Sequence, residues 1–86
     1  MTKKIHQYKI NLITMTDVQN FCFLAETSKM NLKLVDSEHN YAVNASSIMG
    51  VRYSLEWDDL YLISEEDVYF IFKDYITDTT LKYINE

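Results

Sequence analysis

The chain has 86 residues with one glycine, no proline and one cysteine; 48% of its residues are hydrophobic and its net charge is −5. Because glycine and proline mark turns and linkers, this composition predicts a single domain over residues 1–86, built from continuous helices and strands. One glycine cannot supply a dinucleotide fingerprint or a P-loop, and the acidic excess disfavours nucleic acid and membrane surfaces as partners.

Two patterns of apolar residues predict the first elements. Apolar and polar residues alternate over about residues 5–12, which indicates a strand. From about Thr16 to Lys29 the apolar residues recur at i, i+3, i+4 and i+7, which is typical of an amphipathic helix. Thr16 and Gln19 have the spacing of a capping box, so we expect the helix to begin there.

A β-hairpin and a short helix should follow. Two alternating runs, residues 32–34 and 41–43, flank a polar turn and predict the hairpin. The helix is expected over residues 46–53, with Ser46 or Ser47 as its N-cap. The apolar residues expected to point inward from it are Ile48, Val51 and Leu55.

The last third of the chain predicts a fourth strand and a last helix. The strand is expected at Leu60–Ile63, and Ser64 is expected to cap the helix that follows. The element order is then β-α-β-β-α-β-α, which predicts an α+β open-faced β-sandwich, with one four-stranded sheet and helices on one face. The apolar stripe of the last helix comprises Val68, Ile71, Phe72, Tyr75 and Ile76.

Reactive side chains are few and scattered. His6 and His39 have no second ligand at metal-binding spacing. Cys22 falls on the inward stripe of the first helix, which favours a packing role over a nucleophilic one. The carboxylates at residues 58–59 and 65–67 suit a turn and a helix N-terminus. The sequence therefore predicts no enzyme, no metal site and no cofactor.

The same features bear on the compartment. A single cysteine fits a reducing environment. The longest run without Asp, Glu, Lys or Arg, residues 39–51, is too short and too polar to cross a bilayer. We therefore expect a cytoplasmic protein without a membrane span.

One segment resembles a known family. Residues 43–44, Val-Asn, followed by residues 47–51, Ser-Ile-Met-Gly-Val, resemble the region around the regulatory serine of HPr. HPr is the histidine-containing phosphocarrier of the bacterial sugar phosphotransferase system. Residues 28–29, Ser-Lys, stand at the family's spacing before Ser47, and the predicted element order is the family's order. The resemblance covers about residues 4–76 and implies an HPr-like fold with a four-stranded antiparallel sheet.

The resemblance ends at the phosphoryl-transfer site. In HPr proteins the first strand leads into Gly-Ile-His-Ala-Arg-Pro, whereas residues 14–19 here are Thr-Met-Thr-Asp-Val-Gln. Thr16 takes the histidine position and Val18 takes the arginine position. A threonine phosphoester is far more inert than a phosphoimidazole, and Asp17 would repel an incoming phosphate. We therefore expect that the protein does not carry phosphate from phosphoenolpyruvate.

The regulatory serine has a counterpart. The resemblance implies that Ser47 aligns with the serine that HPr kinase phosphorylates, after which the product binds a transcriptional regulator. The catabolite-repression HPr homologue has also lost the histidine and keeps only this role. A phosphate on Ser47 would meet helix N-terminal amides, but Ser47 can equally be only a helix cap.

The expected function is a non-catalytic regulatory or protein-binding role. It would act through the start of the first helix and through residues 47–53, with Met49 and Tyr53 as exposed contacts beside Thr16 and Ser47. Arg52 would pair with a phosphate or spoil an apolar contact. The alternatives are a phosphocarrier that uses another acceptor and an unphosphorylated structural or interaction module. The partner protein and the oligomeric state stay open.

Overall fold

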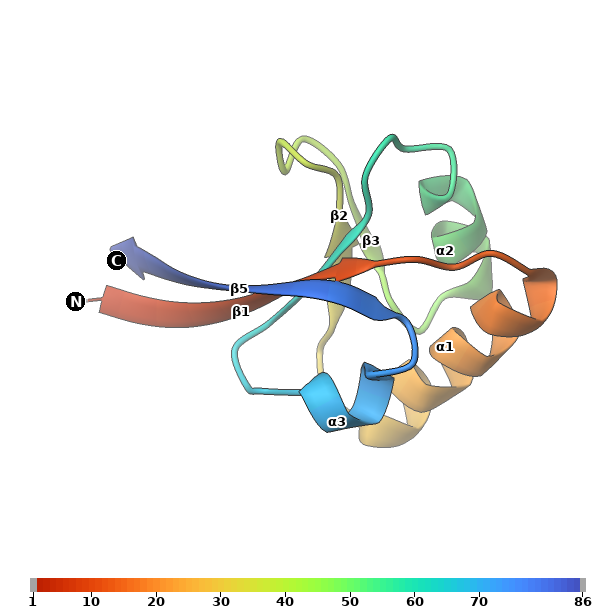
Figure 1. Cartoon of the computed structure of the whole chain (residues 1–86), viewed down its shortest axis with the longest axis horizontal. Coiled ribbons are helices and arrows are strands. Elements are labelled where there is room, and N and C mark those ends of the chain that lie inside the picture. Colours follow the sequence, from red (N-terminus) through yellow and green to blue (C-terminus); the bar gives the residue numbers. More distant parts are fainter. Residues whose placement is uncertain (1, 86) are drawn as a thin grey trace.

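The chain forms helices and strands in the order β-α-β-β-α-β-α-β. The computed structural model describes residues 2–85 and the side chains of residues 4–80. The elements are β1 (Thr2–Ile10), α1 (Met15–Ser28), β2 (Lys33–Val35), β3 (Ala42–Asn44), α2 (Ile48–Ser54), β4 (Tyr61–Ser64), α3 (Tyr69–Phe72) and β5 (Ile76–Asn85). Within residues 2–85 the strands form one antiparallel sheet of order β3-β2-β4-β1-β5 (Figure 1). The predicted α+β class is confirmed, with one strand more than expected.

β1 lies between β4 and β5. It pairs with β4 over residues 6–9 and with β5 over residues 2–10. β1 and β5 therefore extend together as a ribbon beyond the rest of the sheet, and Thr2 pairs with Asn85 at its tip (Figure 1). The predicted hairpin is confirmed, because β2 and β3 pair antiparallel.

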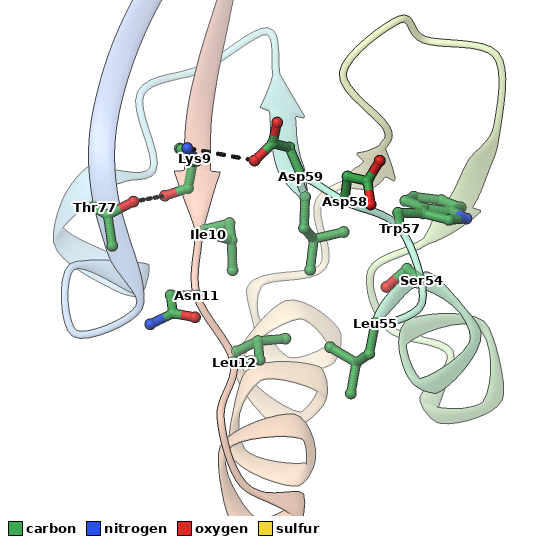
Figure 2. A pocket seen from close by; sticks show the side chains of 11 residues that line it. Lys9, Ile10, Asn11, Leu12, Ser54, Leu55, Trp57, Asp58, Asp59 and Thr77 are labelled. Atoms are coloured by element: carbon green, nitrogen blue, oxygen red, sulfur yellow. Dashed lines mark hydrogen bonds and ion pairs between the residues drawn. The ribbon is translucent and has the colours of Figure 1, made fainter.

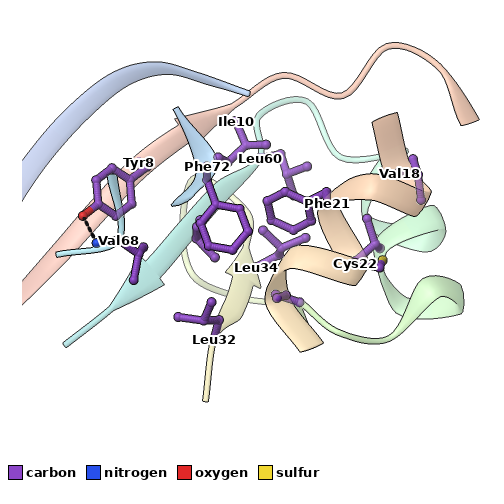
Figure 3. Packing of buried hydrophobic residues seen from close by; sticks show 14 residues of the cluster. Tyr8, Ile10, Val18, Phe21, Cys22, Leu32, Leu34, Leu60, Val68 and Phe72 are labelled. Carbon is purple, nitrogen blue, oxygen red and sulfur yellow. Dashed lines mark hydrogen bonds between the residues drawn. The ribbon is translucent and has the colours of Figure 1, made fainter. Parts of the chain in front are cut away.

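The core lies on one face of the sheet. Tyr8, Leu62 and Leu34 stand side by side across β1, β4 and β2, and all three are buried. Phe21 of α1 and Phe72 of α3 belong to the same buried cluster, with ring centroids 5.0 Å apart (Figure 3). Burial of a large apolar side chain contributes roughly 1.5–3 kcal/mol, so these contacts hold α1 and α3 against the sheet.

The first helix begins earlier than predicted. Thr14, not Thr16, is its N-cap, and its Oγ1 accepts a hydrogen bond from the Asp17 amide at 3.1 Å. The Asp17 carboxylate accepts from the amides of Thr14 and Ile13, at 3.1 and 3.0 Å. The Thr16–Gln19 capping box is therefore wrong, because Asp17 reaches back to the free amides while bearing a charge that the helix N-terminus favours.

The predicted last helix is present, but it is much shorter than expected and Ser64 does not cap it. Helical spacing does continue to residue 76, but α3 is a single turn without a side-chain cap. Ser64 instead accepts a hydrogen bond from the Glu66 amide at 3.1 Å, within the turn after β4. From Ile76 the chain pairs with β1, which satisfies the backbone groups along an edge of β1 that would otherwise be unpaired. The sheet therefore has five strands instead of four.

The short helix α2 agrees with the prediction in its cap but not in its faces. Ser47 is the N-cap, and Val51 is fully buried as predicted. Ile48 and Leu55 were expected to point inward, yet they are 41% and 42% exposed. Two turns of helix present only a narrow face to the core, and Val51 and Ser54 occupy it.

Candidate docking surface

The helix α2 exposes most of its apolar side chains. Met49 is 77% exposed and Tyr53 55% exposed, one turn apart, as the sequence predicted for these two contacts. We use the name α2 surface for these two residues together with Ile48 and Leu55. A soluble surface carries single exposed apolar residues without consequence, but several on one short helix are typical of an interaction site.

Local chemistry holds α2 in this position. The Oγ of Ser47 accepts a hydrogen bond from the Gly50 amide at 3.2 Å. A Cβ atom at Gly50 would lie only 3.2 Å from the Cβ of Val43, so glycine permits the close approach of α2 to β3. At the other end, the buried hydroxyl of Ser54 donates to the Val51 carbonyl at 2.6 Å.

Two aromatic rings, Tyr41 and Trp57, adjoin the α2 surface beyond the helix itself. Trp57 stacks on Tyr41, with ring centroids 6.2 Å apart, and meets Tyr53 edge-on at 6.1 Å. Tyr41 precedes β3, Tyr53 belongs to α2, and Trp57 follows α2. This contact has no local signal in the sequence, because it depends on the hairpin placing Tyr41 beside a turn 16 residues further along.

Trp57 also lines a cavity of about 420 Å³ at the junction of β1 and α2. In Figure 2, Leu12 and Leu55 face each other across it, and both are partly exposed. At its rim, the Nζ of Lys9 lies 3.4 Å from a carboxylate oxygen of Asp59. The cavity is therefore apolar at one end and charged at the other.

A second pocket, of about 320 Å³, lies between the turn after β2 and the segment after α2. We call it the acidic pocket, because five of the residues that line it are carboxylates. Its rings are Tyr41 and Trp57, so it adjoins the α2 surface. The carboxylates are Asp36, Glu38, Glu56, Asp58 and Asp59.

The structure separates the predicted site residues. Thr16 is exposed in the first turn of α1, while Val18 is fully buried in the core. Leu55, at the C-terminal end of α2, lines the same cavity as Leu12, just before α1. Ser47 is exposed at the opposite, N-terminal end of α2.

Arg52 is exposed in the last turn of α2. It stands five residues after Ser47, which corresponds to roughly 7.5 Å along the helix axis. Of the exposed residues of α2, Tyr53 contacts the ring of Trp57.

A polar link lies on the other side of the core. The Tyr8 hydroxyl donates to the Asp67 carboxylate at 2.7 Å. It also accepts from the Val68 amide at 3.0 Å (Figure 3). Burial, together with the hydrogen bond to Asp67, raises the pKa of Tyr8 to about 12. The bond from Tyr8 in turn holds the pKa of Asp67 below its usual value. Such a tyrosine stays protonated at neutral pH, so the link is structural.

Cys22 is buried, as predicted, and burial raises the pKa of its thiol. His39 lies in the turn after β2, with its Nε2 3.0 Å from the side-chain oxygen of Gln7. Among the residues that the structure describes, no three His, Cys, Asp or Glu side chains are grouped to hold a metal ion. No helix in that part of the chain has the length and apolar character needed to cross a bilayer.

Comparison with known proteins adds no relative. No family model, no curated protein and no solved structure matches the chain.

Proposed function

We propose that the chain is a non-catalytic, protein-binding domain whose docking face is the α2 surface. The observation that carries the proposal is the outward placement of apolar side chains on α2, where Met49 and Tyr53 are more than half exposed. Flexible methionine and amphipathic aromatic rings supply large contact area on binding at a modest cost in ordering. The adjoining ring of Trp57 enlarges this face.

An HPr-like fold is part of the proposal. It is supported by the β-α-β-β-α-β order as far as β4 and by the motif residues around α2. Ser47 caps α2, and Gly50 allows the close approach to Val43, so each of these motif residues has a local role. The one-turn α3 and the strand β5 depart from the expected pattern.

The second part of the proposal is that the protein does not carry out phosphoryl transfer. Thr16 stands where the resemblance implies a histidine, and Val18 where it implies an arginine. The burial of Val18 supports this reading, because a side chain at that position points into the core and not toward a phosphate. Incubation with Enzyme I and labelled phosphoenolpyruvate tests it. An acid-labile phosphohistidine would establish the phosphocarrier alternative instead.

The third part of the proposal is that phosphorylation of Ser47 regulates the protein. Its hydroxyl is exposed, and a phosphate there would keep acceptor oxygens near the Gly50 amide. HPr kinase and ATP should then add one phosphate to the wild type and none to Ser47→Ala, as measured by intact mass. A transcriptional regulator is the partner that the resemblance implies, and a cytoplasmic location accompanies it. An unmodified wild type would leave Ser47 as a helix cap.

Photo-crosslinking tests the docking face directly. A photoreactive amino acid is placed at Met49, with the same residue at Asn20, exposed on α1, as the matched control. In cells that produce the protein, position 49 should yield a discrete adduct that position 20 does not. Equal adducts from the two positions, or none from position 49, would refute docking through α2.

A further inference from the structure

The charge around the α2 surface points to the chemistry of the partner. The acidic pocket gathers five carboxylates in a chain whose net charge is −5. Among the residues described, no Lys, Arg or His lines it. Lys9 approaches from outside and pairs only with Asp59, at 3.4 Å. Most of the negative charge in the pocket is therefore left without a cation.

The partners of these carboxylates are unevenly distributed. Asp36 accepts a hydrogen bond from the Tyr41 amide at 3.1 Å, and Glu38 accepts from the side-chain amide of Asn40 at 3.0 Å. Within the described part of the chain, the side-chain carboxylates of Glu56 and Asp58 have neither a hydrogen-bond nor an ion-pair partner. Two of the five carboxylates are therefore free to bind an incoming group.

The position of these two carboxylates is unfavourable for the isolated chain. Glu56 and Asp58 follow the last turn of α2, and the C-terminal end of a helix favours cations over anions. Neighbouring carboxylates also repel one another at neutral pH. A cation bound here would relieve both effects, while an anion would strengthen them.

The rings of the pocket narrow the choice of cation. Tyr41 and Trp57 stack with an interplanar angle of 25°, and both line the pocket beside the carboxylates. The face of an indole or phenol ring attracts ammonium and guanidinium groups through cation–π interaction. A guanidinium group can in addition bind a carboxylate through two parallel hydrogen bonds. The combination therefore suits arginine first and lysine second.

We infer that the α2 surface and the acidic pocket together bind a basic, amphipathic segment of a partner protein. The apolar side chains of that segment would pack on Met49 and Tyr53, and one of its arginines would lie beside Trp57. This inference rests on the proposed docking function and adds the charge of the partner to it. The apolar contacts supply affinity, and the carboxylates select against acidic segments.

A displayed library of random 16-residue peptides is the probe, selected on the whole protein. Enriched peptides should combine apolar residues with arginine or lysine, and binding should change the fluorescence of Trp57, the single tryptophan. Affinity should fall with added salt, because the charged contacts are exposed. The double variant Glu56→Gln, Asp58→Asn should weaken binding roughly tenfold.

Two control variants separate this inference from the docking function. Glu26→Gln with Asp74→Asn makes the same charge change at exposed positions elsewhere and should leave affinity unchanged. Met49→Ser should lower the affinity for every enriched peptide. If the enriched peptides require Met49 for binding but carry no basic residue, the inference of a basic partner is refuted while the docking function stands. If no peptide is enriched, or if the enriched peptides bind Met49→Ser as tightly as the wild type, both the docking function and the basic partner are refuted.

Discussion

Removal of the Tyr8 hydroxyl should destabilise the chain by about 2 kcal/mol, a value that follows from the buried amide it satisfies. The hydroxyl accepts from the Val68 amide at 3.0 Å and donates to Asp67 at 2.7 Å. In Tyr8→Phe the ring stays in the core, so no cavity forms. The Val68 amide is left buried without a partner, and such a group costs roughly 1–3 kcal/mol.

Urea unfolding followed by Trp57 fluorescence measures this effect. The midpoint should fall in Tyr8→Phe with an unchanged slope, and the melting temperature should drop by roughly 10 °C. Tyr69→Phe, which removes a hydroxyl from an exposed ring, is the matched control and should change stability by less than about 0.5 kcal/mol. Equal effects of the two substitutions would refute the argument that the buried amide depends on Tyr8.

The same variant has a distinct pH dependence. The hydrogen bond from Tyr8 is the main reason that the pKa of Asp67 lies below its usual value of 3.8. The ionised carboxylate therefore contributes stability above that value, and the contribution is lost as pH falls through the lowered pKa. Tyr8→Phe should consequently lose less stability than the wild type when the pH is lowered from 7 into this acid range.

Further expectations concern α1, the core and the α2 surface. Thr14→Ala should cost about 1 kcal/mol in urea unfolding and Thr16→Ala should cost less than half of that, because Thr14 is the N-cap. Hydrogen bonds from the amides of Thr14 and Ile13 hold the pKa of Asp17 below its usual value, so Asp17→Asn should reduce the stability lost on acidification, measured by unfolding at pH 7 and below 4. Phe72→Ala should cost about 3–5 kcal/mol by calorimetry, because its ring is fully buried against Phe21. Met49→Ser should leave stability within about 0.5 kcal/mol by the same method while it weakens the binding of selected peptides.

The predicted elements were right where local pattern and tertiary packing agree. The alternation around Tyr8 and the stripe of Phe21 on α1 were visible in the sequence, because each is set by burial on one face. After Val68 the apolar spacing predicts a helix as far as residue 76, whereas α3 ends at Phe72 and a strand begins at Ile76. The strand was missed because its pairing with β1 joins positions more than 60 residues apart. Such a contact leaves no trace in a local period.

The candidate site was predictable only in part. Met49 and Tyr53 were identified as exposed, because they fall off the inward stripe of a helix whose cap, Ser47, is also visible in the sequence. The acidic pocket was not identified, because its carboxylates come from two turns that are far apart in the chain. In sequence, Asp58 and Asp59 after Trp57 have the composition of an ordinary turn. In the folded chain Tyr41 stacks on Trp57, and Asp58 and Asp59 line the same pocket as these two rings.

The two positions that the proposed alignment sets against the HPr histidine and arginine differ in burial. Thr16 is exposed, so a histidine would fit there without disturbing the core. Val18 is fully buried, and an arginine at this position would have to leave water without a partner, at a cost of several kcal/mol. Under the proposed alignment, an arginine at position 18 could therefore not face a phosphate without a change in this core. The α2 surface includes neither position, so the proposed docking through α2 does not depend on this alignment.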